Sequence, residues 1–174
     1  MPHPDHAPFR PLALLGALIL PGLGHVLAGE RARGACIAVG VLGLFFGGIL
    51  IGGIDVVDSR EDRIWFYGQA LVGPVAFGVD HLHQSRFKVI DPATGTRRSA
   101  FPDEGRDPAT GMAVPGTPPN RKSIGKMNEI GTLFATIAGM LNLIAIIDAA
   151  APGPRTPPKP ATPAAPTKPA TTAA

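Results

Sequence analysis

The chain has 174 residues, about the size of one domain, and carries a formal net charge of +3 at pH 7. Hydrophobic residues make up 45% of it and charged residues only 17%, although it also contains 22 glycines and 20 prolines. The single cysteine, Cys36, excludes an intrachain disulfide and a zinc site built from cysteines, and the small, scattered excess of basic residues (16 against 13 acidic) predicts no nucleic-acid binding.

The hydrophobic residues are concentrated in four segments that carry almost no charge. A helix needs about 20 apolar residues to cross a hydrocarbon core of about 30 Å, and backbone groups in lipid must be hydrogen-bonded within the segment. The segments comprise residues 11–27, 34–54, 64–82 and 130–147. They predict an all-α membrane protein with a bundle of about four transmembrane helices, the third kinked at Pro74.

The composition divides the chain into five parts. These are an N-terminal tail (1–10), a hairpin plus a third transmembrane helix (11–82), a polar loop (83–129), a fourth transmembrane helix (130–150) and a Pro/Ala-rich tail (151–174). The last part has nothing to form a core with, so we expect it to be disordered.

Pro21 and Gly22 interrupt the first apolar segment. One interpretation is a secretory signal cleaved near residues 26–28, and the other is a retained helix that is thin, tilted or broken at Pro21. We favour the retained helix because the next apolar segment begins only six residues after Ala28. The link 28–33 then closes a tight helical hairpin.

His25 lies near the end of the first segment, among glycines that allow close backbone approach and a sharp reversal. Its ring can donate an N–H to a carbonyl freed at the break, or bind a carboxylate of the fourth helix, Glu129 or Asp148. We therefore predict that His25 is a structural pin between hairpin and bundle, with a proton or metal role as the alternative. The predicted hairpin residues are Pro21, Gly22, Gly24, His25 and Gly29.

Small residues recur in the second and fourth apolar segments, mostly at four-residue steps, where they let helices approach closely. The predicted helix-packing positions are Gly43, Gly47, Gly48, Gly52, Gly131, Ala135 and Gly139. Small residues serve packing within a chain and dimerisation equally. We favour packing within the chain, with a protein partner or a homo-oligomer as the alternative.

Polar groups next to membrane segments are candidates for a functional site. They are Asp80, His81, His83, Glu129, Asn142 and Asp148. On a helix, His81 and His83 point about 200° apart, so they do not share a metal ion unless the helix has ended. The sequence lacks the nucleophile-elbow, P-loop and zinc-protease motifs, so we predict no enzyme activity, no cofactor and no metal.

The polar loop contains the sequence Asp-Pro-Ala-Thr-Gly twice, at residues 91–95 and 107–111. Asp-Pro starts a turn and glycine accepts a positive φ at its end, so each copy predicts a turn; a calcium loop is the alternative. Residues 87–90 and 97–101 are expected to flank the first copy as a β-hairpin.

Arginine and lysine mark the cytoplasmic side of a membrane protein. Their distribution over four crossings favours both termini outside, with the links 28–33 and 83–129 inside.

Residues 20–29, followed by Arg31 and Arg33-Gly34, resemble the Pro-Gly-Leu-Gly-His hairpin signature of small bacterial membrane proteins related to the TM-two domain. The chain lacks that signature's aromatic pair after His25. Residues 128–149 resemble an uncharacterised bacterial family that joins such a hairpin to further helices. The resemblance implies a multi-pass protein of the bacterial cell membrane with a retained first helix, and it implies no particular activity.

Three functions remain open. We favour a non-enzymatic component of the lipid bilayer that acts by helix packing and partner binding. A small transporter or accessory subunit would use Asp80, His81 and Asn142 on a polar path. An enzyme acting on lipid or envelope substrates would need His25, Glu129 and Asp148 to converge at one membrane face.

Overall fold

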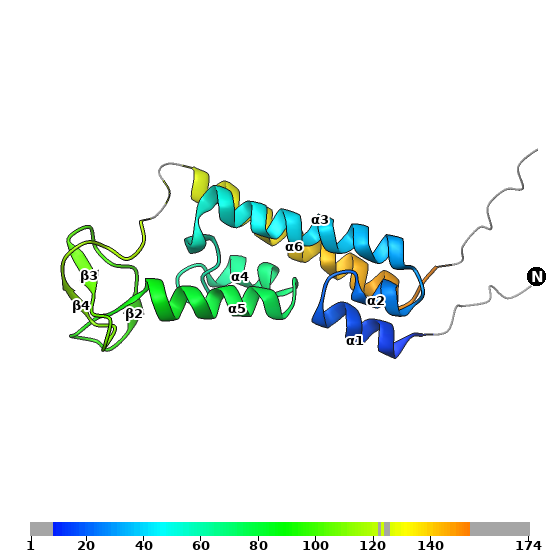
Figure 1. The fold of residues 1–174 in the computed structure, drawn as a ribbon, viewed down its shortest axis with the longest axis horizontal. Coiled ribbons are helices and arrows are strands. Elements are labelled where there is room, and N and C mark those ends of the chain that lie inside the picture. The colour runs from blue at the N-terminus through cyan, green and yellow to red at the C-terminus, as the bar shows by residue number, and fades with distance from the viewer. Residues whose placement is uncertain (1–8, 122, 124–125, 154–174) are drawn as a thin grey trace, which may run out of the picture.

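Two long helices dominate the structure, a computed structural model that describes residues 9–121, 123 and 126–153 (Figure 1). They are α3 (Arg31–Gly52) and α6 (Met127–Ala150), which lie side by side along the long axis. The pair is antiparallel, because Gly48 contacts Gly131 at one end and Arg33 pairs with Asp148 at the other. Each is long and apolar enough to cross a membrane, although no membrane is present.

The first apolar segment forms two short helices instead of one crossing. They are α1 (Pro11–Ile19) and α2 (Leu23–Leu27), which pack against each other and against the end of the α3–α6 pair. The break has a local cause: Pro21 has no N–H to donate, and Gly22 has a φ of +81°, which favours glycine. The retained helix of the sequence interpretation is therefore broken at Pro21.

The third apolar segment is broken as well. After a short 3-10 turn (η1, Ile54–Val56) it forms α4 (Arg63–Ala70) and α5 (Pro74–Leu82), joined at Gly73, whose φ is +103°. The prediction of four spanning helices was thus wrong in two segments. Four crossings would also place the links 28–33 and 83–129 at the same end of the bundle, and the structure places them at opposite ends.

Helices α1 and α2 form one helical hairpin, and α4 and α5 form another. The tips of these two hairpins meet alongside α6. In Figure 1, α1 and α5 lie end to end, and a Cβ added at Gly73 would lie 2.8 Å from the carbonyl oxygen of Leu18. An apolar hollow at this junction is also lined by Leu143 and Ile146 of α6. Leu143 is seven residues from the end of α6, so the tips meet about 10 Å inside the helix pair.

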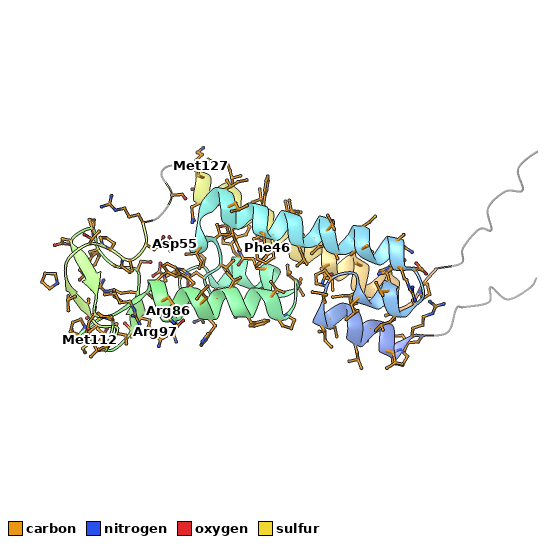
Figure 2. All side chains as sticks on the ribbon, viewed as in Figure 1. Phe46, Asp55, Arg86, Arg97, Met112 and Met127 are labelled. Carbon is orange, nitrogen blue, oxygen red and sulfur yellow. The ribbon has the colours of Figure 1, made fainter. Side chains whose placement is uncertain are left out.

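The polar loop forms a small module at one end of the molecule. It begins with a π-helix (η2, His83–Phe87) and continues as two antiparallel hairpins with short strands. The strands are β1 (Val89–Ile90), β2 (Arg97–Arg98), β3 (Glu104–Arg106) and β4 (Ala113–Pro115). Figure 2 shows Met112 near the outer end of this module and Asp55 at its junction with the helices.

Each Asp-Pro-Ala-Thr-Gly copy forms the turn of one hairpin. Asp91 and Asp107 each accept a backbone N–H two residues on and one from the closing glycine, Gly95 or Gly111, which has a positive φ. The predicted hairpin around the first copy is confirmed, with Val89 opposite Arg98. These strands differ from the all-α fold that the sequence predicted.

The second and fourth apolar segments lie within three residues of the observed helices. Their core positions bring together side chains of α3, η1, α4, α5 and α6, which form one buried apolar cluster: Val41, Phe45, Val56, Val57, Phe66, Val72, Ala76, Ala135 and Ala138. The expected disordered tail at 151–174 lies outside the described residues from residue 154, and the N-terminal tail lies outside them up to residue 8.

Candidate functional site

One polar cluster lies where α2 meets the end of α6. The Nε2 atom of His25 lies 2.8 Å from Oδ2 of Asp148, and Nη2 of Arg33 forms an ion pair with the same oxygen at 2.7 Å. Arg33 also bonds Glu30 at 3.2 Å. His25 is buried at 1% exposure, so burial holds its ring against α6. Asp148 is one of the two carboxylates that the sequence analysis named for this histidine.

The other ring nitrogen of His25 has no partner in the described part of the chain. Nδ1 is buried and makes no hydrogen bond to any described residue. With Nε2 donating to Asp148, Nδ1 carries the lone pair in the neutral tautomer. This arrangement ties the hairpin to α6 by one charge-assisted bond.

We expect His25→Leu to lower the free energy of unfolding by about 1–3 kcal/mol, because it removes a charge-assisted bond and leaves Asp148 with one partner fewer. His25→Gln should retain most of the stability, since its amide nitrogen reaches the position of Nε2, which asparagine does not. Thermal unfolding in detergent measures both variants. Zinc should raise the midpoint little in the wild type; a marked rise that His25→Gln abolishes would replace the pin with a metal site.

A second cluster lies at the opposite end, under the strand module. His83, fully buried, faces an acceptor with each ring nitrogen: Nδ1 lies 3.0 Å from the carbonyl oxygen of Val57 and Nε2 2.9 Å from Oδ1 of Asp55. Asn120 donates to the other Asp55 oxygen at 2.6 Å. Because an acceptor oxygen lies against each ring nitrogen, neither nitrogen of His83 is open to a metal ion.

Lys88 forms the charged centre of this end. Its ammonium group is buried at 2% exposure and lies 2.6 Å from both Asp58 and Glu61. Burial of Asp58 would raise its pKa, but the hydrogen bond from Lys88 and the backbone N–H groups of Arg60 and Glu61 outweigh it, and the pKa lies below its ordinary value of 3.8. The pKa of Glu61 is lowered from 4.5 in the same way, by Lys88 and Ser99 against burial.

These lowered pKa values predict a loss of stability in acid. A carboxyl group whose pKa is lower in the folded state stabilises fully above its unfolded pKa, and that contribution is lost as pH falls through the folded pKa. The thermal midpoint should therefore be flat near neutral pH and begin to fall below about pH 4.5. In Asp58→Asn the fall should be smaller, and an unchanged pH profile in that variant would contradict the assignment to Asp58.

Of the remaining sequence-predicted polar residues, only Asp80 adjoins this charged centre among the described residues, because Gln84 donates to Asp58 at 2.9 Å and to Asp80 at 3.4 Å. Asp80 accepts hydrogen bonds from the backbone and hydroxyl of Ser59 at 2.9 and 2.7 Å, while His81 is exposed. Glu129 is exposed near the start of α6, beside a small hollow. Among the residues that the structure describes, no three His, Cys, Asp or Glu side chains lie together as a metal site would require.

The side chain of Asn142 binds the backbone of the α4–α5 hairpin. It is fully buried, and its Nδ2 donates to the carbonyl oxygen of Leu71 at 2.8 Å, where the break after α4 leaves that carbonyl without a helical partner. Gln69, also fully buried, donates to the carbonyl of Val56 at 2.8 Å. Both amide oxygens lack a hydrogen-bond partner among the described residues.

The predicted packing positions divide into three groups. Gly48, Gly52, Gly131 and Ala135 lie in the seam between α3 and α6, where a Cβ added at Gly48 would lie 2.6 Å from the carbonyl oxygen of Gly131. Gly139 faces Gly68 of α4. Gly43 and Gly47 meet nothing within 4 Å in the described chain, so they take no part in its packing.

The residues required by the two alternative functions do not come together. Glu129 and Asp148 lie 19 residues apart on α6, which is about 28 Å, so His25 meets only the second of them. Asp80, His81 and Asn142 are not joined by hydrogen bonds among the described residues. Sequence reasoning missed Asp55, Asp58 and Lys88, and its only available signal was the cluster of acids directly after the second apolar segment.

Comparison with known proteins gives a family and no activity. A protein family described as a family of unknown function (DUF6677) matches residues 12–161, which is most of the chain. No curated protein and no solved structure matches the chain. The chain therefore belongs to this family of unknown function, DUF6677.

Proposed function

We propose that the protein is an integral membrane protein in which α3 and α6 cross the bilayer, and that it acts as a structural or partner-binding component. The exposed surface of the helix pair carries this proposal. Val39 is 74% exposed, Leu50 87% and Ile144 64%, and only 22% of the most apolar part of α3 is buried. The core helix of a water-soluble domain buries such side chains.

The distribution of charge supports the same environment. Residues 34–52 of α3 and 130–147 of α6 carry no charged side chain, and the ion pairs lie at the two ends of the pair. The polar groups along the middle, such as Gln69 and Asn142, are buried inside the protein. This is the pattern expected across a hydrocarbon layer between two aqueous phases.

The two hairpins fit a membrane because their turns are bonded within the protein. Broken helices at membrane depth are tolerated only where the freed backbone groups find partners. At the α4–α5 tip, Asn142 binds the Leu71 carbonyl, and the N–H groups of Val72 and Gly73 donate to Gln69 and Ala70. We therefore place the hairpins in the bilayer, entering from opposite faces and meeting inside.

A charge introduced on the exposed middle of α3 tests the proposal. Val39→Lys should lose membrane insertion, because a lysine at mid-bilayer costs about 2.5–3.5 kcal/mol on an insertion scale, whereas an exposed site in water tolerates it. Ala93→Lys, at an exposed position in the strand module, is the control and should insert normally.

The readout is the fraction that stays with membranes after alkaline carbonate extraction. Wild type and Ala93→Lys should remain in the pellet, and Val39→Lys should appear largely in the supernatant or be degraded. Recovery of the wild type in the soluble fraction contradicts membrane integration, as does a Val39→Lys protein that behaves like the wild type.

A further inference from the structure

A groove runs between α3 and α6 from the end where Arg33 and Asp148 pair. Its walls are apolar, formed by Ile37 and Val41 of α3 and Leu141 and Ile144 of α6, and its volume is about 420 Å³. Gly40 opens the groove, because a Cβ there would meet nothing within 4 Å. From Arg33 to Val41 the groove extends about 12 Å along α3.

A second hollow adjoins the mouth of this groove and shares Arg33 with it. It surrounds the first turn of α3 and is lined by residues 29–33. The first helical hydrogen bond runs from the N–H of Gly34 to Glu30, so the N–H groups of residues 31–33 have no partner among the described residues. Three free N–H groups at the positive end of a long helix form an anion-binding surface.

The side chains at the mouth carry charges of both signs. Arg31 is exposed with no ion pair among the described residues, whereas Arg33 is held by Glu30 and Asp148. These two carboxylates reduce the positive charge around Arg33. An anion would therefore contact Arg31 and the backbone N–H groups of residues 31–33. Arg33 stays fixed at the boundary between the two hollows.

We propose that this composite site binds a phospholipid, with one acyl chain in the groove and the phosphate at the first turn of α3. The inference rests on the proposed membrane location, which puts the first turn of α3 at the lipid surface and the groove in the hydrocarbon. A flexible chain fits a groove opened at one glycine between bulky side chains. A second helix packs best on small residues, and the open glycines Gly43 and Gly47 of α3 do not line the groove.

The test uses the full-length protein in mild detergent and native mass spectrometry with two probes. Dioleoylphosphatidylglycerol carries the phosphate, and dioleoylglycerol has the same chains without it. Gly40→Leu fills the groove, and Gly47→Leu is the matched control, because both glycines lie on α3 with open space around them. Arg31→Gln changes an exposed side chain and tests the phosphate contact without disturbing packing.

We expect the wild type to bind the phospholipid more tightly than dioleoylglycerol. Gly40→Leu should weaken phospholipid binding about fivefold, or about 1 kcal/mol, while Gly47→Leu leaves it unchanged. Arg31→Gln should weaken the phospholipid and leave dioleoylglycerol unaffected. Equal binding by the two glycine variants, or equal binding of the two probes by the wild type, overturns the site. Loss of the protein from carbonate-washed membranes contradicts the membrane proposal itself, so the two failures are distinguishable.

Discussion

Replacing Lys88 with methionine is expected to lower the free energy of unfolding by about 3–5 kcal/mol, the usual loss when one partner of a buried ion pair is removed. The methionine fills most of the volume of the lysine stem, so the loss reports the charge. Without the ammonium group, the buried carboxylate of Asp58 and the carboxylate of Glu61 lose the positive charge that lies between them. Chemical unfolding in detergent measures the change.

Lys126→Met is the control, because Lys126 is exposed and makes no ion pair among the described residues. It should change stability by less than about 0.5 kcal/mol. The double variant Lys88→Met with Asp58→Leu should recover part of the loss, since an apolar pair can replace a buried ion pair. A Lys88→Met protein as stable as the wild type contradicts the buried ion-pair centre.

Gly139→Leu is expected to lower stability by about 3 kcal/mol, the upper part of the range for overpacked sites. Gly139 lies against the backbone carbonyl of Gly68, so any side chain there forces α4 away from α6. Leu141→Ala should cost much less, because Leu141 is 47% exposed on another side of the same helix. Thermal unfolding in detergent gives the comparison.

Gly43→Leu is the matched control for Gly139→Leu. A Cβ at Gly43 meets nothing within 4 Å, and leucine favours a helix more than glycine does, so stability should be unchanged or slightly higher. Equal losses at the two glycines would show that the contact between α4 and α6 does not contribute to stability.

The two long helices were predictable from the sequence because an uncharged run of about 20 apolar residues has few other stable solutions. The broken segments were harder. Apolar composition is the same whether a segment crosses a bilayer once or enters and returns, and only Pro21-Gly22 and Gly73-Pro74 mark the turns. The positive φ values of Gly22 and Gly73 are visible only in the structure.

The polar clusters were only partly predictable, since their members are distant in sequence. His25 and Asp148 are separated by 123 residues, and the sequence left Glu129 as an equal partner until the direction of α6 was known. Lys88 and Asp58 are 30 residues apart and meet only because α5 returns toward the end of α3. No local pattern encodes such a pairing.

The sidedness of three exposed positions tests the arrangement of two crossings and two hairpins most directly. Single cysteines at Ala32, Ala93 and Ala151, placed in a Cys36→Ser background, would be labelled by a membrane-impermeant thiol reagent in sealed vesicles of known orientation. Two crossings place Ala32 and Ala151 on one side and Ala93 on the other, because Arg33 pairs with Asp148 near the end of α6 while the strand module lies at the opposite end. Labelling of Ala32→Cys together with Ala93→Cys, and of Ala151→Cys from the opposite side, is the pattern of four crossings and would contradict this account.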